Sequence, residues 1–386
     1  MKKSALFLLW VGAAISISEI FTGGLLAPLG LVKGLAAIIA GHLIGTGLLA
    51  LGGLVSFSRR ANAMETVTFS LGREGGKLVA LCNVVQLAGW TIIMIVQGGS
   101  AIKSLFPGLP FAPLSLGLGL MVLLWALGFG SPVQWINSIV VILLSALCVI
   151  LLWETAGKAQ GPVLSASMSF ALALELSIAM PISWLPLVGD YSSQSSDRVG
   201  AALMPFAGYF LGSVFMYSLG LFIRIKTGTD FFVMIAASRF RFIACAVILF
   251  STLTTAFLDL YSAAVSSQQF VKTRNTRLPI LALGLFTALA SAVFPAERYG
   301  DFLTNFLTLI GMVFVPVYGI VFIDFFAKRR EYPSKINLPA LMAALIAMGV
   351  YRLCTIRNIG IPSLVSLAVL CGIYIPIIRI QIRRNP

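Results

Sequence analysis

Charged residues are scarce in this chain of 386 residues: only 10% are Asp, Glu, Lys or Arg, whereas a soluble domain carries about 25%. Hydrophobic residues make up 59%, and the mean hydropathy is +0.99. Apolar runs of about 20 residues, the length that crosses a bilayer core, follow one another with short breaks. The composition therefore predicts an all-α polytopic membrane protein embedded in a lipid bilayer, and no stretch is long enough for a separate soluble domain.

Histidine and cysteine are also rare. The chain has one histidine and five cysteines, and no CxxC spacing suggests a disulfide framework or a zinc site. GxSxG, Walker A and HExxH motifs are missing as well. The sequence therefore indicates that the protein is not an enzyme and needs no cofactor beyond a coupling ion, Na⁺ or H⁺. For His42, a hydrogen-bonded packing role is favoured over a proton relay.

Acidic residues are half as frequent as basic ones, and the net charge is +14. This positive charge does not indicate nucleic-acid binding, because the basic residues lie in the breaks between apolar runs. Most of them fall on the cytoplasmic side if both termini are placed there, as the positive-inside rule requires. We therefore expect a multi-pass protein of the inner (cytoplasmic) membrane with both termini in the cytoplasm.

About twelve transmembrane spans are predicted, roughly at 5–30, 33–56, 77–103, 113–130, 134–153, 167–189, 199–223, 240–264, 278–294, 302–325, 337–353 and 361–378. Two segments between spans, 63–72 and 229–238, are amphipathic, which is typical of short surface helices and also fits a gate.

The first and sixth spans contain residues that break helices: Gly23, Gly24 and Pro28 in one, Pro181, Pro186 and Gly189 in the other. If five spans form one repeat, these two spans correspond. Interrupted helices at corresponding positions of two halves indicate the midplane site of a transporter, although Gly and Pro are common in membrane helices generally.

Three acids lie well inside apolar runs: Glu19, Glu175 and Asp259. No Lys or Arg is buried deeply enough in the spans to pair with them. A buried carboxylate without a partner must be protonated, bind a cation or bind a donor on a ligand. All three acids are therefore candidate substrate-binding residues.

Two spans carry polar stripes. Asn83, Gln86, Trp90 and Gln97 share one helical face, on which Trp90 could stack on a flat ring while Gln86 reads its polar edge; the alternative is a polar seam between helices. In the eighth span Thr252, Thr255 and Asp259 share a face, bordered by Ser251 and Thr254. These four hydroxyl residues suit Na⁺, although hydroxyls also let helices approach closely.

Four stretches, in order, resemble the nucleobase:cation symporter-1 family: 12–36, the Gly89-Trp90 pair, the run from Trp184 through Asp190-Tyr191 to Ser192, and 251–267. The first and last are similar to the subgroup to which transport of hydroxymethylpyrimidine, a thiamin precursor, is ascribed. The resemblance covers roughly residues 8–325. Met94 departs from the family, which has a polar residue there.

The resemblance implies a LeuT-like fold: a transport core at 1–326, made of two inverted five-helix repeats at about 5–153 and 167–325, and two trailing helices at 327–386. It implies that Trp90 stacks on the substrate, that Glu19 lies on the substrate side, that Trp184 is a second tryptophan of the site, and that Ser251, Thr252, Thr254 and Thr255 include the cation ligands.

The function expected is therefore cation-coupled symport of a pyrimidine-type heterocycle, with hydroxymethylpyrimidine first. A carboxylate can meet the amino group and a ring N–H of an aminopyrimidine together. The alternatives are another nucleobase, such as cytosine or a purine, or an amino acid carried on the same fold. A channel would need a continuous polar lining, and a membrane enzyme would need nucleophile–base pairs; the sequence favours neither.

Overall fold

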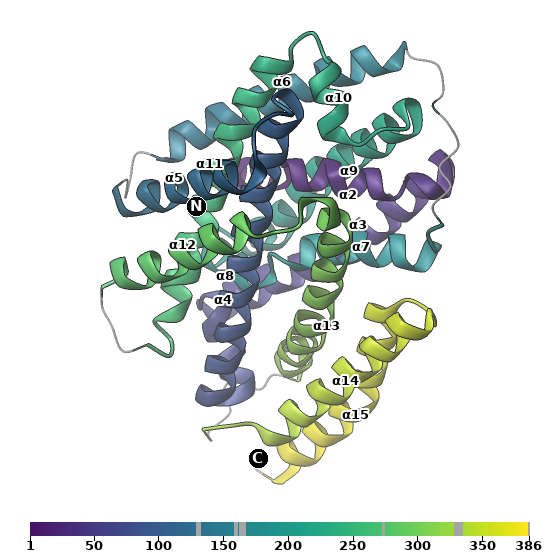
Figure 1. Ribbon diagram of the computed structural model, residues 1–386. Coiled ribbons are helices and arrows are strands. Elements are labelled where there is room, and N and C mark those ends of the chain that lie inside the picture. Colours follow the sequence, from purple (N-terminus) through teal and green to yellow (C-terminus); the bar gives the residue numbers. More distant parts are fainter. Residues whose placement is uncertain (129–132, 158–160, 162–166, 272–274, 328–334, 385–386) are drawn as a thin grey trace.

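The computed structural model describes residues 1–128, 133–157, 161, 167–271, 275–327 and 335–384, all helical or in connecting turns (Figure 1). The helices are α1 (Lys3–Ala14), α2 (Ile17–Leu25), α3 (Gly30–Arg59), α4 (Ala63–Leu105), α5 (Phe111–Gly128), α6 (Val133–Ala156), α7 (Phe170–Ile182), α8 (Leu185–Ser192), α9 (Arg198–Thr227), α10 (Phe231–Ala237), α11 (Arg241–Ser267), α12 (Arg277–Ala292), α13 (Tyr299–Phe326), α14 (Leu338–Arg357) and α15 (Pro362–Arg384), with 3₁₀ turns η1 (Ala27–Leu29) and η2 (Ala296–Arg298).

Each of the twelve predicted spans corresponds to one helix or to one interrupted pair, α1–α2 or α7–α8, so the all-α polytopic fold is confirmed. Within the described residues, ten helices are long and apolar enough to cross a membrane, and Lys3–Ala14 and Arg277–Ala292 are shorter apolar helices. Five basic residues used for the orientation, Lys272, Arg274, Lys328, Arg329 and Arg330, lie outside the described residues. The sidedness and the repeat boundaries stay predictions.

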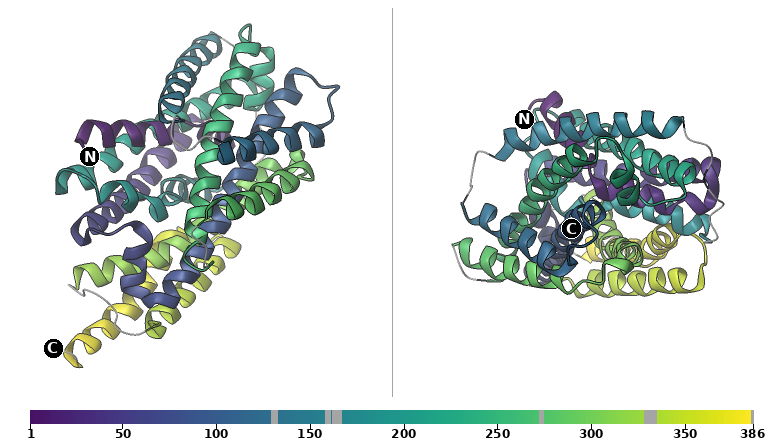
Figure 2. Two further views of the ribbon diagram at one scale, coloured as in Figure 1. Left: turned by 90° about the vertical axis from the view of Figure 1, so that its left-hand side faces the viewer. Right: turned by 45° about the horizontal axis from the view of Figure 1, so that its top comes forward.

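The helices pack in two groups. The bundle, made of α1, α2, α3, α7, α8 and α9, is held by contacts of α9 with α1, α2 and α3 and of α3 with α7. The scaffold, made of α4, α5, α11 and α12, is held by the pairs α4–α11 and α5–α12. The trailing hairpin α14–α15 lies at one side, against α13 (Figures 1 and 2). Residues that line the cavity described below come from both groups.

Both predicted amphipathic segments are helical. Residues 229–238 contain α10, whose Asp230 caps the helix by accepting from the Val233 N–H at 3.0 Å. Residues 63–72 form the first turns of α4, which kinks at Gly72, where φ is +77°. That left-handed conformation favours glycine because a side chain there would clash with the backbone.

The break of the first span was predicted at the wrong place. The helix is interrupted at Ile15 and Ser16, between α1 and α2, whereas Gly23 and Gly24 lie inside α2. A Cβ on Gly23 would clash with the Tyr217 backbone of α9, so this glycine serves close helix packing. The break of the sixth span is confirmed: it falls at Ser183 and Trp184, between Pro181 and Pro186.

Candidate substrate-binding site

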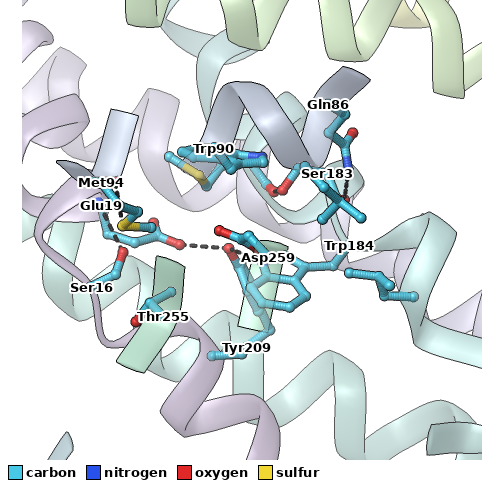
Figure 3. A pocket seen from close by; sticks show the side chains of 15 residues that line it. Ser16, Glu19, Gln86, Trp90, Met94, Ser183, Trp184, Tyr209, Thr255 and Asp259 are labelled. Carbon is cyan, nitrogen blue, oxygen red and sulfur yellow. Dashed lines mark hydrogen bonds between the residues drawn. The ribbon is translucent and has the colours of Figure 1, made fainter. Parts of the chain in front are cut away.

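A cavity lies where the two interrupted helix pairs face the scaffold (Figure 3). It is lined by Ala13, Ser16, Ser18, Glu19, Gln86, Leu87, Trp90, Met94, Met180, Ser183, Trp184, Leu187, Tyr209, Thr255 and Asp259. These residues come from α1, α2, α4, α7, α8, α9 and α11 and from the breaks between α1 and α2 and between α7 and α8. Both helix breaks, at Ser16 and at Ser183, open onto it.

The breaks between α1 and α2 and between α7 and α8 position polar groups of the bundle at the cavity. Ser16 caps α2: its hydroxyl oxygen accepts from the Glu19 N–H at 3.4 Å, which fixes the turn that carries Glu19. At the other break the Ser183 carbonyl accepts a hydrogen bond from the Gln86 side-chain NH₂ at 2.8 Å. Gln86 therefore ties the scaffold helix α4 to the break between α7 and α8.

The Glu19 carboxylate is buried and held on both oxygens by α9. Tyr209 donates to its Oε1 at 2.6 Å, and Ser213 lies 2.5 Å from its Oε2. Trp184 donates its indole N–H to the Tyr209 hydroxyl at 3.1 Å. Glu19, Tyr209 and Trp184 thus form one connected wall of the cavity.

Asp259 is the contrasting acid. It is 7% exposed, lines the cavity from α11, and among the described residues no side chain or backbone group hydrogen-bonds to its carboxylate. The Gln86 Oε1 atom is likewise buried without a partner. Two acceptors facing one cavity without donors form a site for a ligand that brings donors of its own.

The aromatic walls come from α4 and from the break between α7 and α8. Trp90 of α4 is held edge-on by Phe306, with ring centroids 5.3 Å apart, which leaves it fixed at the cavity wall. Trp184 packs edge-on against Trp10 at 5.8 Å. Met94 and Met180 add polarizable apolar surface. A flat ring can therefore be enclosed between aromatic and sulfur-bearing side chains.

Five of the six substrate-binding candidates predicted from sequence line this cavity: Glu19, Gln86, Trp90, Trp184 and Asp259. Glu175 does not. Its Oε1 accepts from the Tyr351 and Ser363 hydroxyls at 2.6 and 2.5 Å, and its Oε2 accepts from the Ser363 N–H at 2.9 Å. The carboxylate therefore anchors α7 to the α14–α15 hairpin, away from the other five residues.

The four hydroxyl residues predicted to hold Na⁺ lie in different surroundings. Thr255 lines the cavity. Thr252 packs against α4 at Gly98 with its hydroxyl unpartnered, and Thr254 donates to its own helix at the Phe250 carbonyl, 3.0 Å away. Ser251 is buried. Their role as cation ligands stays a prediction.

Sequence reasoning missed Tyr209 and Ser213. Both lie on α9, a span for which no functional residue was predicted, and each is one polar group in an otherwise apolar or small-residue run. The signal available was indirect, namely that Glu19 needs donors and α9 places these two hydroxyls one helical turn apart.

Comparisons with known proteins agree with this architecture. The family described as permeases for cytosine/purines, uracil, thiamine and allantoin matches residues 2–351. The fold is similar to the inward-facing conformation of Mhp1, with a TM-score of 0.85 at 16% identity over 100% of this chain and 92% of that one. No curated protein sequence matches the chain.

Two further solved structures are similar. Mhp1, described as a nucleobase-cation-symport-1 family transporter in a closed conformation with bromovinylhydantoin bound, gives a TM-score of 0.77 at 17% identity over 100% and 94% of the two chains. A manganese transporter from Eremococcus coleocola gives 0.62 at 12% identity over 99% and 96%. At these identities the likeness shows the fold alone.

Proposed function

Because the chain belongs to the family of permeases for cytosine/purines, uracil, thiamine and allantoin, we propose that it is a cation-coupled symporter of an aminopyrimidine, with hydroxymethylpyrimidine as the first candidate. The substrate occupies the cavity between Trp90, Trp184, Glu19 and Asp259. The structurally similar Mhp1 is described as a nucleobase-cation-symport-1 family transporter with bromovinylhydantoin bound, which supports a flat heterocycle as the substrate.

The observation that carries the proposal is the excess of acceptors over donors in the cavity. Among the described residues no group donates to the Asp259 carboxylate or to the Gln86 Oε1 atom, whereas the Trp184 N–H and the Gln86 NH₂ are already bonded to Tyr209 and Ser183. The lining contains no Lys or Arg. Such a site selects a ligand rich in N–H groups, because a ligand rich in carbonyls would leave these acceptors unpaired.

An aminopyrimidine supplies those donors. Its exocyclic NH₂ has two N–H groups, and protonation of the neighbouring ring nitrogen adds a third. A carboxylate can accept from the NH₂ and the ring N–H side by side, as it does from a guanidinium. Asp259 is the acid available for this pairing, and Trp90 provides the stacking face, which is worth about 1–3 kcal/mol for a base on an aromatic ring.

Cytosine also carries an amino group on a pyrimidine, whereas uracil has carbonyls at both positions. An amino acid would bring a carboxylate, and the described lining holds no Lys or Arg to pair with it. We therefore expect aminopyrimidines to bind first, cytosine next, and uracil and amino acids weakly.

The test is uptake of radiolabelled hydroxymethylpyrimidine into proteoliposomes, with unlabelled cytosine, uracil, thiamine, allantoin and leucine as competitors. Saturable uptake, inhibited in the order just given, supports the proposal. If uracil inhibits uptake as strongly as unlabelled hydroxymethylpyrimidine does, the cavity does not select ligands rich in N–H donors and the proposal is wrong.

A further inference from the structure

A line of hydrogen bonds runs from the cavity wall into the interior of the bundle. The Ser213 hydroxyl lies 2.5 Å from Glu19 Oε2 on one side and 2.5 Å from His42 Nε2 on the other. Glu19, His42 and Ser213 are each at most 1% exposed. Figure 3 shows the cavity end of this line, where Glu19 meets Tyr209. The other end, His42, lies on α3, which packs against α9.

At each end of this line of hydrogen bonds, the neighbouring groups determine where the hydrogen lies. His42 Nδ1 is 2.8 Å from the Ile38 carbonyl, which can only accept, so Nδ1 carries a hydrogen and Nε2 is the nitrogen that is free to gain one. At the other end the indole N–H of Trp184 occupies the Tyr209 oxygen, so the Tyr209 hydrogen points to Glu19 Oε1.

Between these ends the hydrogens can be counted. The contacts of Ser213 with Glu19 and with His42 need two hydrogens, and the hydroxyl supplies one. The second must be on Glu19 Oε2 or on His42 Nε2. With no second proton, two lone pairs would face each other at one of the 2.5 Å contacts; with a third, Ser213 would accept at both contacts and its own hydrogen would have no acceptor among the described residues. The geometry is thus satisfied by one added proton.

We infer that Glu19, Ser213 and His42 form a relay that holds this one proton, and that H⁺ is the ion coupled to transport. The inference rests on the proposed function. In one arrangement Glu19 is a neutral acid that donates to Ser213, and Ser213 donates to a neutral His42. In the other, His42 is an imidazolium that donates to Ser213, and Ser213 donates to the Glu19 carboxylate.

The two arrangements interconvert without loss of any atom. The O–H bond of Glu19 breaks as its proton passes to Ser213 Oγ, the original Ser213 O–H bond breaks, and a new N–H bond forms on His42. A substrate N–H group that reaches Glu19, beside the pairing with Asp259, favours the second arrangement, because an N–H group binds a carboxylate better than a neutral acid. The proton stays in the protein on His42 and crosses with the substrate, because leaving without it would strand a net negative charge in the bundle.

Other titratable groups around the relay are few. From α9, Tyr217 packs edge-on against His42 with ring centroids 4.7 Å apart and donates to the Leu176 carbonyl, and Tyr209 contacts Glu19. Asp259 of α11 shares the cavity, and whenever it is ionised its charge adds to the cost of losing the proton from Glu19. Glu175 of α7 is bonded to Tyr351 and Ser363. In the described part of the chain, no Lys or Arg hydrogen-bonds to the relay.

The chain contains a single histidine, so the relay can be observed directly. Protein labelled with ¹⁵N-histidine, purified with a tag free of histidine and studied in liposomes, gives NMR signals from one imidazole. We expect Nδ1 to be protonated, and His42 Nε2 and the Glu19 carboxyl to change together in one step as pH rises. Saturating hydroxymethylpyrimidine should raise the imidazolium fraction.

Variants separate the relay from ordinary packing. Glu19→Gln and Ser213→Ala should abolish the shared step. Thr46→Val should keep it, because the Thr46 hydroxyl bonds only to the His42 carbonyl oxygen one turn away. A His42 that titrates identically in the wild type and in Glu19→Gln, or that carries no hydrogen on Nδ1, overturns the relay.

Coupling is measured in sodium-free proteoliposomes with the membrane potential clamped. One proton per neutral substrate lets the wild type and Thr46→Val accumulate hydroxymethylpyrimidine up to about tenfold per pH unit of gradient. His42→Gln and Ser213→Ala should equilibrate the substrate without accumulating it. Uptake that requires Na⁺ and ignores the pH gradient overturns H⁺ as the coupling ion. If His42 and Glu19 titrate in one step but no family substrate is taken up, the proposed substrate class is wrong and the relay stands.

Discussion

Replacing Asp259 by asparagine should weaken substrate binding without destabilising the substrate-free protein. The carboxylate is buried, faces the cavity and has no hydrogen-bond partner among the described residues, so asparagine removes no bond of the empty protein. It removes the charge from a pairing that forms only with substrate. Hydrogen bonds to charged groups contribute about 1.5–3 kcal/mol, so affinity for hydroxymethylpyrimidine should fall by about 10- to 150-fold.

Glu175→Gln is the matched control, because Glu175 is also a buried acid but has a different role. Its carboxylate accepts three hydrogen bonds from Tyr351 and Ser363. A glutamine would turn its NH₂ toward either the Ser363 N–H or the two hydroxyls. This change should cost about 1–3 kcal/mol of stability and lower the melting temperature, while the affinity for substrate stays near that of the wild type.

Both quantities come from one preparation. The melting temperature of each purified variant is measured without substrate, and the dissociation constant is measured by scintillation proximity with labelled hydroxymethylpyrimidine. The two variants should show opposite patterns. If Asp259→Asn binds hydroxymethylpyrimidine as tightly as the wild type while remaining folded, the carboxylate does not contact the substrate and the proposed recognition of the aminopyrimidine edge is wrong.

Three further substitutions test the cavity and the helix packing around it. Trp90→Ala should lower affinity by about 1–3 kcal/mol through loss of stacking, measured in the same binding assay; unchanged affinity in a monodisperse variant removes Trp90 from the site. Gln86→Leu should weaken binding and loosen the tie to the break between α7 and α8, giving both a lower affinity and a lower melting temperature; a change in stability alone would make Gln86 structural. Gly23→Ala should prevent folding because its Cβ would clash with the Tyr217 backbone, whereas Gly47→Ala, with nothing within 4 Å, should express normally; equal yields by fluorescence size-exclusion chromatography would contradict the packing of α2 on α9.

Much of the fold followed from local properties of the sequence. The length of each apolar run specifies a membrane span, because the bilayer has a set thickness and the helix a set rise per residue. The stripe of Gln86 and Trp90 on α4 and the position of Asp259 on α11 follow from helical periodicity, which needs no neighbour to be known. Pro181 and Pro186 mark the break of the sixth span because proline lacks an N–H and clashes with the preceding turn.

Tertiary structure alone decided which buried groups meet. Glu19, Glu175 and Asp259 look alike in sequence, each an acid in an apolar run, yet Glu175 finds its donors on a hairpin almost two hundred residues away and leaves the cavity. Gly23 of α2 fits both a helix break and a close helix contact, and only the approach of α9 identifies it as a packing residue. The link from Glu19 through Ser213 to His42 joins three helices. Residue type and periodicity describe one helix at a time, whereas a hydrogen-bond network depends on the distances between helices.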